Sequence, residues 1–448
     1  MARQDGAASA PLVDRVADWL MAQALGDAEL DGIVRGCCER LLAAGIPIFR
    51  ANLSFSVLHP LYRAVGFIWR RGEGLEVSGY RHLRDDSAAD QFLRSPFYYL
   101  RQNDLDHLRR RLDKAGRAEF PILEELRREG ATDYLAFAIP FEPTKKQGMM
   151  GSWTTDQKGG FTNDDLRALL RLQERLAVAC KMAVRDAIAR NVLATYLGPN
   201  AGKRVFAGQI RRGDGETTRA ALVWGDLRGS TILAETLGRE GYIEALNTFF
   251  DMVAGAVADA GGEIASFVGD GFLAIFPCGR NRQESAQACG QALAGAVEAG
   301  DRMAEANRDR EARGATRLEF GIGLHLGNVM FGNVGLVDRL TFSAFGAAVN
   351  EAARLQALTK IYGTPIIASD HFIDYAGGDW EPLGEAELRG VEGAVAVFRP
   401  QGGTGRGRAV LRYDHAAGMT DAENIVLLHR DLAPDAVPAI AGPGPARP

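Results

Sequence analysis

Residues 263–276 limit the possible folds of this chain more than any other segment. Two apolar runs, 263–268 and 272–276, are joined by the tight turn Gly269-Asp270-Gly271, and this pattern predicts a β-hairpin. Asp270 is then placed at the tip of the hairpin. The segment therefore predicts a carboxylate held on a turn between two strands.

A second carboxylate follows another predicted strand. The apolar run 220–224 ends at Gly225-Asp226, and Ser230 or a neighbour is expected to cap a helix after it. If the strands are neighbours in one sheet, Asp226 and Asp270 converge, and two convergent carboxylates suit Mg²⁺ that keeps phosphate oxygens as ligands. The alternative is that Asp226 caps the helix and Asp270 merely suits its turn. The helix has an apolar face made by Ile243, Leu246, Phe249, Phe250 and Val253.

The third informative region combines strands with a polar helix face. Residues 318–326 and 328–334 predict a pair of strands joined near Gly327, and a helix is expected from about Gly346. Asn350 and Arg354 are four residues apart and share one face of that helix. They are able to donate several hydrogen bonds to a phosphoryl group, whereas the alternative role is a surface salt link.

These segments together resemble the class III nucleotide cyclases. The resemblance rests on Trp-Gly-Asp-Leu-Arg-Gly-Ser-Thr at 224–231, the hairpin at 261–276, Gly-x-x-x-Gly-Asn-Val at 323–329 and Ala-Val-Asn-Glu-Ala-Ala-Arg-Leu at 348–355. It covers about 180 residues in the family's order. It implies an α/β (α+β) fold with a ferredoxin-like catalytic domain that works as a head-to-tail homodimer, its active sites lying between the two chains.

The resemblance also implies roles for single residues. Asp226, Asp270 and the carbonyl of Leu227 correspond to the ligands of two Mg²⁺ or Mn²⁺ ions. Asn350 and Arg354 correspond to the pair that orients the ribose and stabilises the transition state from the partner chain. Arg389 lies near the position at which the family places a basic residue on the terminal phosphates.

The positions that read the base depart from the family pattern. Ser266 stands where adenylate cyclases usually have Lys, and Ser343 where they have Asp or Thr. Guanylate cyclases use Glu and Cys or similar residues there, so serine matches neither set. The bacterial family favours ATP as substrate, which makes the expected enzyme an adenylate cyclase that forms 3′,5′-cyclic AMP and pyrophosphate.

Other functions remain open at this point. One alternative is a guanylate or other nucleotide cyclase, and another is a degenerate cyclase fold that binds nucleotide without turnover. A diguanylate cyclase is disfavoured because Gly261-Gly262-Glu263 continues as Ile264-Ala265 and lacks the acidic-Phe ending.

The N-terminal half predicts a separate α/β domain. Apolar and polar residues alternate over 49–57, further strands are expected at 64–69, 135–141 and 148–154, and helices at 88–112 and 120–128. Thr162 and Asp165 form a capping-box pattern that begins a helix over 162–197. This order resembles a GAF-type sensory domain, with a small molecule or protein as possible regulator. The Arg109–Arg111 run is expected on a solvated helix face, and core packing is expected for the aromatic residues Trp69, Phe97, Tyr98, Tyr99 and Trp153.

Composition limits the class of protein and indicates where the domains begin and end. Residues 1–195 form the expected regulatory domain, 198–218 a linker or transducer, 219–400 the cyclase domain and 401–448 a flexible tail rich in Gly and Pro. A net charge of −5 argues against nucleic-acid binding. No transmembrane segment is expected, because no window is apolar for the ~18 residues that a spanning helix needs. Five cysteines without paired spacing favour a cytoplasmic location.

Overall fold

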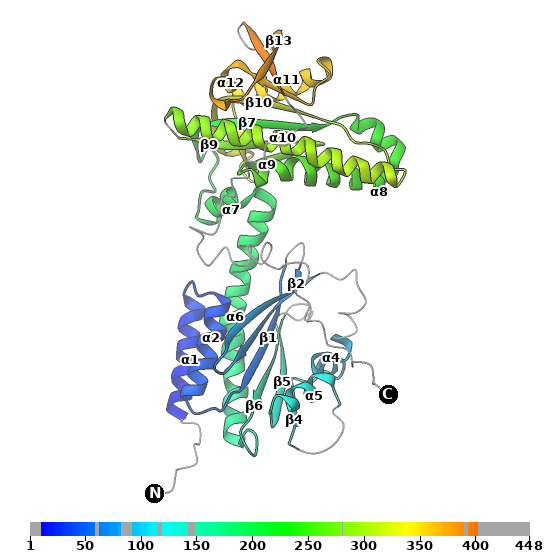
Figure 1. Cartoon of the computed structure of the whole chain (residues 1–448). Helices are drawn as coiled ribbons and strands as arrows, with labels where there is room; N and C mark the ends of the chain where they lie inside the picture. Colours follow the sequence, from blue (N-terminus) through cyan, green and yellow to red (C-terminus); the bar gives the residue numbers. More distant parts are fainter. Residues whose placement is uncertain are drawn as a thin grey trace. The chain divides into compact units, whose positions relative to one another are not determined.

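The computed structural model describes residues 10–58, 62–81, 92–113, 119–141, 148–279, 281–388 and 393–401. These residues form two compact units, with the division between Val192 and Leu193 (Figure 1). Arg389 and the predicted tail beyond Gln401 lie outside the described residues. Within the ranges described, no helix is both long and apolar enough to cross a lipid bilayer.

The first unit is built on a six-stranded antiparallel sheet with the order β3-β2-β1-β6-β5-β4. The strands expected at 49–57, 64–69, 135–141 and 148–154 are all confirmed. The strands are β1 (Arg50–Ser56), β2 (Tyr62–Arg70), β3 (Gly74–Arg81), β4 (His107–Arg111), β5 (Asp133–Pro140) and β6 (Gly148–Thr155).

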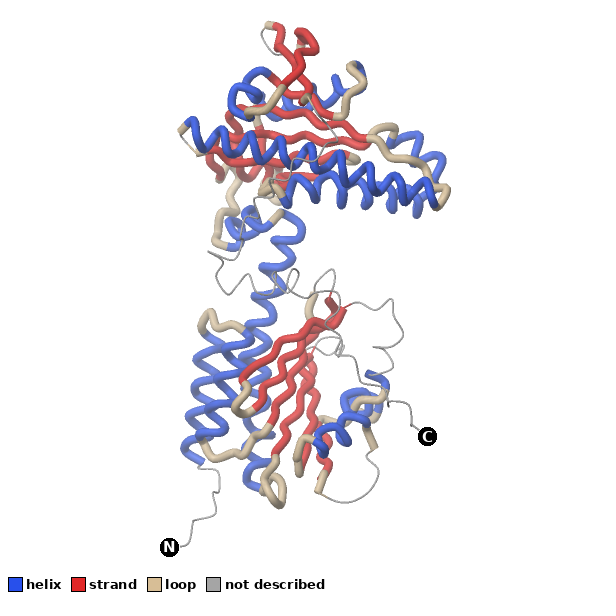
Figure 2. The backbone as a smooth tube through the Cα atoms, in the orientation of Figure 1, coloured by secondary structure: helices blue, strands red, loops and turns tan. Residues whose placement is uncertain are grey.

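Helices cover both faces of this sheet (Figure 2). On one face α1 (Ala10–Leu25), α2 (Leu30–Ala43) and α6 (Asn163–Leu197) bury a core that includes Trp69 and Trp153, as predicted for these two aromatic side chains. On the other face α4 (Pro96–Gln102) and α5 (Pro121–Arg128) pack over Tyr134 and Ala136. The helix predicted at 120–128 is therefore confirmed.

The helix expected over 88–112 is wrong in its second half. Residues 107–111 form β4, which pairs with β5, and Arg109 does not lie on a solvated helix face. Its guanidinium binds Asp133, a fully buried carboxylate, with Nη2 at 2.6 Å from Oδ2. An ion pair between the half-buried Arg109 on β4 and the fully buried Asp133 on β5 holds this arginine in the sheet, a contact that the local sequence does not reveal.

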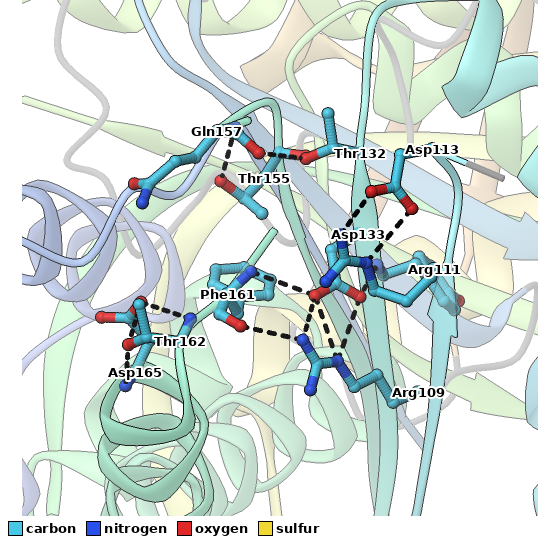
Figure 3. Close-up of polar contacts among 11 residues, drawn as sticks. Arg109, Arg111, Asp113, Thr132, Asp133, Thr155, Gln157, Phe161, Thr162 and Asp165 are labelled. Atoms are coloured by element: carbon cyan, nitrogen blue, oxygen red, sulfur yellow. Dashed lines mark hydrogen bonds and ion pairs between the residues drawn. The ribbon is translucent and has the colours of Figure 1, made fainter. Parts of the chain in front are cut away.

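The same carboxylate anchors the start of α6 (Figure 3). Asp133 accepts a hydrogen bond of 3.0 Å from the amide of Phe161, and Arg109 donates to the carbonyl of Phe161 at 2.8 Å. Immediately afterwards the amide of Asp165 donates to Thr162 Oγ1 at 3.1 Å, while the amide of Thr162 donates to Asp165 Oδ2 at 2.9 Å. The predicted capping box is confirmed, and it fixes where the helix begins.

The second unit contains a sheet with the order β13-β14-β12-β10-β7-β9-β8, and β11 pairs with β10 outside this path. Its pairs are antiparallel except for β10 with β12. The hairpin predicted at 263–276 is confirmed as β8 and β9. The strands are β7 (Gly215–Leu227), β8 (Glu263–Val268), β9 (Gly271–Cys278), β10 (Phe320–Gly335), β11 (Leu340–Phe345), β12 (Ile366–Ser369), β13 (Trp380–Glu387) and β14 (Ala394–Pro400).

Helices again lie on both faces of this sheet. A core that includes Phe249, Val253 and Leu324 joins one face to α8 (Ser230–Phe249), the π-helix η1 (Phe250–Ala254), α9 (Gly255–Asp259), α10 (Arg282–Ala312) and α12 (Asp370–Ala376). On the other face α11 (Ala347–Ile361) packs against β10. The predicted linker segment 198–218 contains α7 (Pro199–Phe206) and the start of β7.

One local prediction in this unit is wrong. Residues 318–334 do not form a strand pair with a turn at Gly327, because β10 continues through that residue. A side chain there would place Cβ 2.5 Å from Cβ of Ala348, so the glycine makes room for α11. The cap of α8, expected at Ser230 or a neighbour, is the neighbouring residue Gly229. The helix begins after Gly229, whose φ of 68° is left-handed and which makes no side-chain cap.

Candidate active site at the ends of β7 and β9

Two carboxylates meet where β7 ends and β9 begins. Asp226 is paired with Gly271 in the sheet, and Asp270 immediately precedes that glycine in the hairpin turn. The amide of Leu227 donates a 3.1 Å hydrogen bond to the carbonyl of Asp270, which fixes the two segments together. The predicted convergence of Asp226 and Asp270 is therefore present in the structure.

The two carboxylates repel each other. Partial burial and, to a smaller extent, the negative charge of Asp270 raise the pKa of Asp226 to about 6. The positive charge of Lys360 on α11 lowers this pKa. A divalent cation between the two side chains would relieve this repulsion. The residues present therefore fit a divalent ion.

The protein offers an incomplete ligand set for such an ion. The part of the chain that the structure describes holds no cluster of three or more His, Cys, Asp or Glu side chains. Asp226, Asp270 and the Leu227 carbonyl leave coordination positions for oxygens from elsewhere, and Mg²⁺ is commonly bound through one or two carboxylates plus substrate phosphates. Their role as ligands remains a prediction.

Three glycines let α11 lie unusually close to β10. A Cβ on Gly321 would be 2.2 Å from Thr359 Oγ1, one on Gly323 would be 2.2 Å from the carbonyl of Ala352, and Gly327 faces Ala348. The helix therefore runs antiparallel to the strand, with its C-terminal end at Gly321 and its N-terminal end at Gly327. Gly321 is the residue paired with Asp226, so the C-terminal end of α11 lies level with the carboxylates.

Asn350 and Arg354 are placed away from that end. Asn350 is ten residues before Lys360, which corresponds to about 15 Å along a helix axis, and Arg354 is six residues before it, about 9 Å. Asn350 is exposed and Arg354 is half-buried. Neither side chain makes a hydrogen bond or ion pair with any described residue of the same chain. The amide and the guanidinium thus share one helix face as predicted, but the chain does not join them to Asp226 or Asp270.

His325 is a residue that sequence analysis missed. It lies between Gly323 and Gly327 on β10, with Nε2 3.3 Å from a carboxylate oxygen of Glu351 and Nδ1 2.9 Å from Ser369 Oγ. Burial, reinforced by His371, lowers the pKa of His325 to about 4, so the ring is neutral at pH 7. A neutral ring that accepts at Nδ1 and donates from Nε2 satisfies both contacts. The available signal was one polar side chain within a glycine-rich, otherwise apolar strand.

The two serines at the predicted base-reading positions are brought together. Ser343 Oγ donates to Ser266 Oγ at 3.2 Å, although 77 residues separate them in the sequence. Ser343 on β11 is 4% exposed, while Ser266 on β8 is half-buried beside an irregularity in the pairing with β9. Their role in base recognition remains a prediction, and so does the role of Arg389.

Residues 215–390 match the family described as the adenylate and guanylate cyclase catalytic domain. This part of the chain is a class III nucleotide cyclase catalytic domain with the α/β fold of that family. The match leaves the N-terminal unit unassigned, so its GAF-like identity stays a prediction.

Similar proteins carry both adenylate and guanylate cyclase names. The chain is 31% identical over 168 residues to an adenylate cyclase of Anabaena cylindrica, an alignment that covers 37% of this chain and 32% of that protein. It is 35% identical over 221 residues to an uncharacterized protein of Mycobacterium tuberculosis, with 47% and 39% covered. The crystal structure of the guanylyl cyclase Cya2 aligns with 29% identity and a TM-score of 0.37, over 42% of this chain and 95% of that one. The chain thus spans about a third of the length of the curated relatives it matches.

Proposed function

We propose that the chain is an adenylate cyclase that converts ATP to 3′,5′-cyclic AMP and pyrophosphate. The observation that carries the proposal is the convergence of Asp226 and Asp270 within a cyclase catalytic domain. Two carboxylates that repel each other at close range are arranged to bind cations.

Each polar group has a separate task in this proposal. Asp226, Asp270 and the Leu227 carbonyl bind two Mg²⁺ or Mn²⁺ ions together with the triphosphate. When bound, the ions lower the pKa of the ribose 3′-hydroxyl and neutralise the departing pyrophosphate. Asn350 orients the ribose, and Arg354 donates hydrogen bonds to the phosphoryl group as negative charge develops on it. Arg389 contacts the terminal phosphates.

The separation along α11 supports a site built from two chains. A single chain holds the carboxylates near one end of the helix and Asn350 towards the other, with no contact between them. Two copies arranged head to tail would bring the carboxylates of one chain opposite the amide and guanidinium of the other. We therefore propose a homodimer through the cyclase unit.

ATP is the proposed nucleotide. Relatives from Anabaena cylindrica and Rhizobium meliloti are named adenylate cyclases, which supports ATP. The Ser266–Ser343 pair favours weak discrimination, because two short hydroxyls that bond to each other lack the reach of the lysine found in many adenylate cyclases. A guanylate or other nucleotide cyclase is the second candidate on this observation.

The proposal is tested by supplying ATP, GTP, CTP and UTP together to the purified chain with Mn²⁺. Cyclic AMP is the expected main product, and Asp270→Asn is expected to abolish its formation. Glu235→Gln, which removes one exposed acidic charge from α8, is the matched control and should leave the rate unchanged. If cyclic GMP were the main product, the substrate would be GTP and not ATP. Nucleotide binding without product under every metal condition would establish the degenerate alternative.

Regulation by the N-terminal unit forms the last part of the proposal. The helix α6 begins at the capping box of that unit and ends at Leu197, close in sequence to the cyclase domain. A signal received by the N-terminal unit would reach the cyclase through this helix, because completion of a two-chain site depends on how the chains face each other.

A further inference from the structure

A row of polar side chains crosses the sheet of the first unit on the face covered by α4 and α5. Strand pairing places Arg70, Arg50, Thr154 and Tyr134 next to one another across β2, β1, β6 and β5. Residues paired in this way point to the same face of a sheet. Tyr134 belongs to the core beneath α4 and α5, which identifies the face. The next row carries Asn52 and Ser152.

Arg50 is the unusual member of this row. The residue is only 6% exposed, yet its guanidinium makes no hydrogen bond or ion pair with any residue that the structure describes, and its Nε is fully enclosed. Burial and, to a smaller extent, the positive charge of Arg70 lower the pKa of Arg50. The carboxylates of Glu125 and Glu129 act on it only from beyond ion-pair distance. A buried charge without a partner is costly, so a structural arginine normally has one.

Other arginines of the same sheet show what a structural role looks like. Arg109 is bound through two nitrogens to the buried carboxylate of Asp133. Arg70, directly opposite Arg50, has Glu76 at 3.3 Å. Arg50 alone among these three lacks a carboxylate, although it is the most deeply buried of them.

Further polar atoms beside Arg50 are also unsatisfied. Asn52 Oδ1 and Thr154 Oγ1 are enclosed and have no hydrogen-bond partner. The hydroxyl of Tyr134 interacts with Ser152, and both residues are almost fully buried. A hydroxyl donor and a guanidinium that lie side by side without partners match the needs of an anionic oxygen group, whereas Asn52 Oδ1 is an acceptor and does not bind the anion.

We propose that Arg50, with Thr154, binds a small anionic ligand that carries a carboxylate or phosphate group. The guanidinium donates to two oxygens of the anion, and Thr154 donates to one of them. The anion would supply the counter-charge that Arg50 lacks. This inference does not depend on the proposed cyclase activity.

The test measures the melting temperature of the full-length protein in sodium phosphate, sodium acetate and sodium succinate, each compared with sodium chloride at equal ionic strength. We expect at least one anion to raise the melting temperature of the N-terminal transition by about 3 °C, through preferential binding to the folded state. A response to phosphate alone, or to the carboxylates alone, identifies the group that the site accepts.

Three variants separate this site from general salt effects. Arg50→Gln is expected to lose the anion response and to melt no lower than wild type in chloride, because an unpaired buried charge has been removed. Arg50→Lys keeps the charge but cannot bind two oxygens, so a reduced response is expected. Arg185→Gln, an exposed position on α6, should respond like wild type. The proposal would be overturned if wild type and both Arg50 variants responded equally to the anions, or if wild type did not respond. It would also be overturned if Arg50→Gln melted lower than wild type in chloride while Arg50→Lys kept the full anion response.

Discussion

At the scale of single residues, Asp226 illustrates a conflict between stability and the proposed chemistry. The folded protein holds this carboxyl beside Asp270 and partly removes it from water, so its pKa rises to about 6. Ionisation of Asp226 therefore costs more in the folded state than in the unfolded state. The cation-free protein loses stability as pH rises from about 4 through 6, and that loss is complete at neutral pH.

Asp226→Asn is expected to abolish activity and to stabilise the protein without metal. At pH 7.5 in EDTA the free energy of unfolding should rise by about 1 kcal/mol, a value reduced to allow for screening by solvent. The gain should vanish near pH 4, where the wild-type carboxyl is protonated. Chemical denaturation at both pH values measures the difference, with Glu235→Gln as the control for net charge. A variant less stable than wild type at pH 7.5 would contradict the account.

His325 makes a pH-dependent contribution of the opposite sign. Its pKa is lowered to about 4 in the folded protein, so its contribution to stability is complete above the unfolded value near 6.5 and is lost as pH falls towards 4. The charged or titratable groups around the ring are Glu351, His371 and Asp370. His325→Gln should show a weaker acid destabilisation between pH 6.5 and 4 than wild type, as followed by melting temperature. An identical pH profile in the variant would show that the ring does not titrate in this range.

At the scale of elements, the approach of α11 to β10 positions the polar helix face. Gly321, Gly323 and Gly327 leave no side chain between strand and helix, and His325 provides the polar link through Glu351, the neighbour of Asn350. The orientation of Asn350 and Arg354 therefore depends on packing beneath the helix and not only on the helix itself.

Gly323→Ala tests this arrangement. Its Cβ would lie 2.2 Å from the carbonyl of Ala352, so the helix must move, and we expect a loss of about 2 kcal/mol in stability together with a large loss of activity. Gly290→Ala on α10 is the matched control, because nothing lies within 4 Å of its Cβ, and it should be neutral or stabilising. Melting temperature and turnover are measured for both. A Gly323→Ala protein as stable and active as wild type would show that close approach is unnecessary.

Sequence reasoning succeeded where local patterns agreed with the fold and failed where distant partners decided it. The hairpin around Asp270 and the capping box at Thr162 depend on neighbouring residues, and both were predicted. Gly327 suggested a turn because its helix partner lies further along the chain. The arginine run at β4 was assigned to a helix because Asp133, the residue that holds Arg109 in the sheet, follows 24 residues later.

In the candidate site, too, local motifs were predicted and contacts between distant residues were not. The carboxylates and the Asn350–Arg354 face are visible as motifs, and the structure brings the two carboxylates together. The hydrogen bond between Ser266 and Ser343 and the link from His325 to Glu351 join residues that are far apart in the sequence, so no local pattern specifies them.

At the scale of the whole molecule, a cyclase catalytic domain follows a unit whose antiparallel sheet holds a separate, uncompensated arginine. The proposed enzyme therefore has two anion-binding sites, one for a nucleoside triphosphate in the cyclase domain and one for a small anionic regulator in the N-terminal unit. Because one chain carries the two carboxylates apart from Asn350 and Arg354, the central claim of the proposal is that activity requires two chains.

Co-expression of two differently tagged inactive variants, Asp270→Asn and Arg354→Ala, tests this claim most directly. Sequential purification on both tags isolates heterodimers, in which one site lacks both groups and the other keeps both. The account predicts that each variant alone is inactive and that the heterodimer recovers about half of the wild-type rate of cyclic AMP formation. A heterodimer as inactive as its two parents would contradict it, because the carboxylate and the guanidinium would then have to act within one chain.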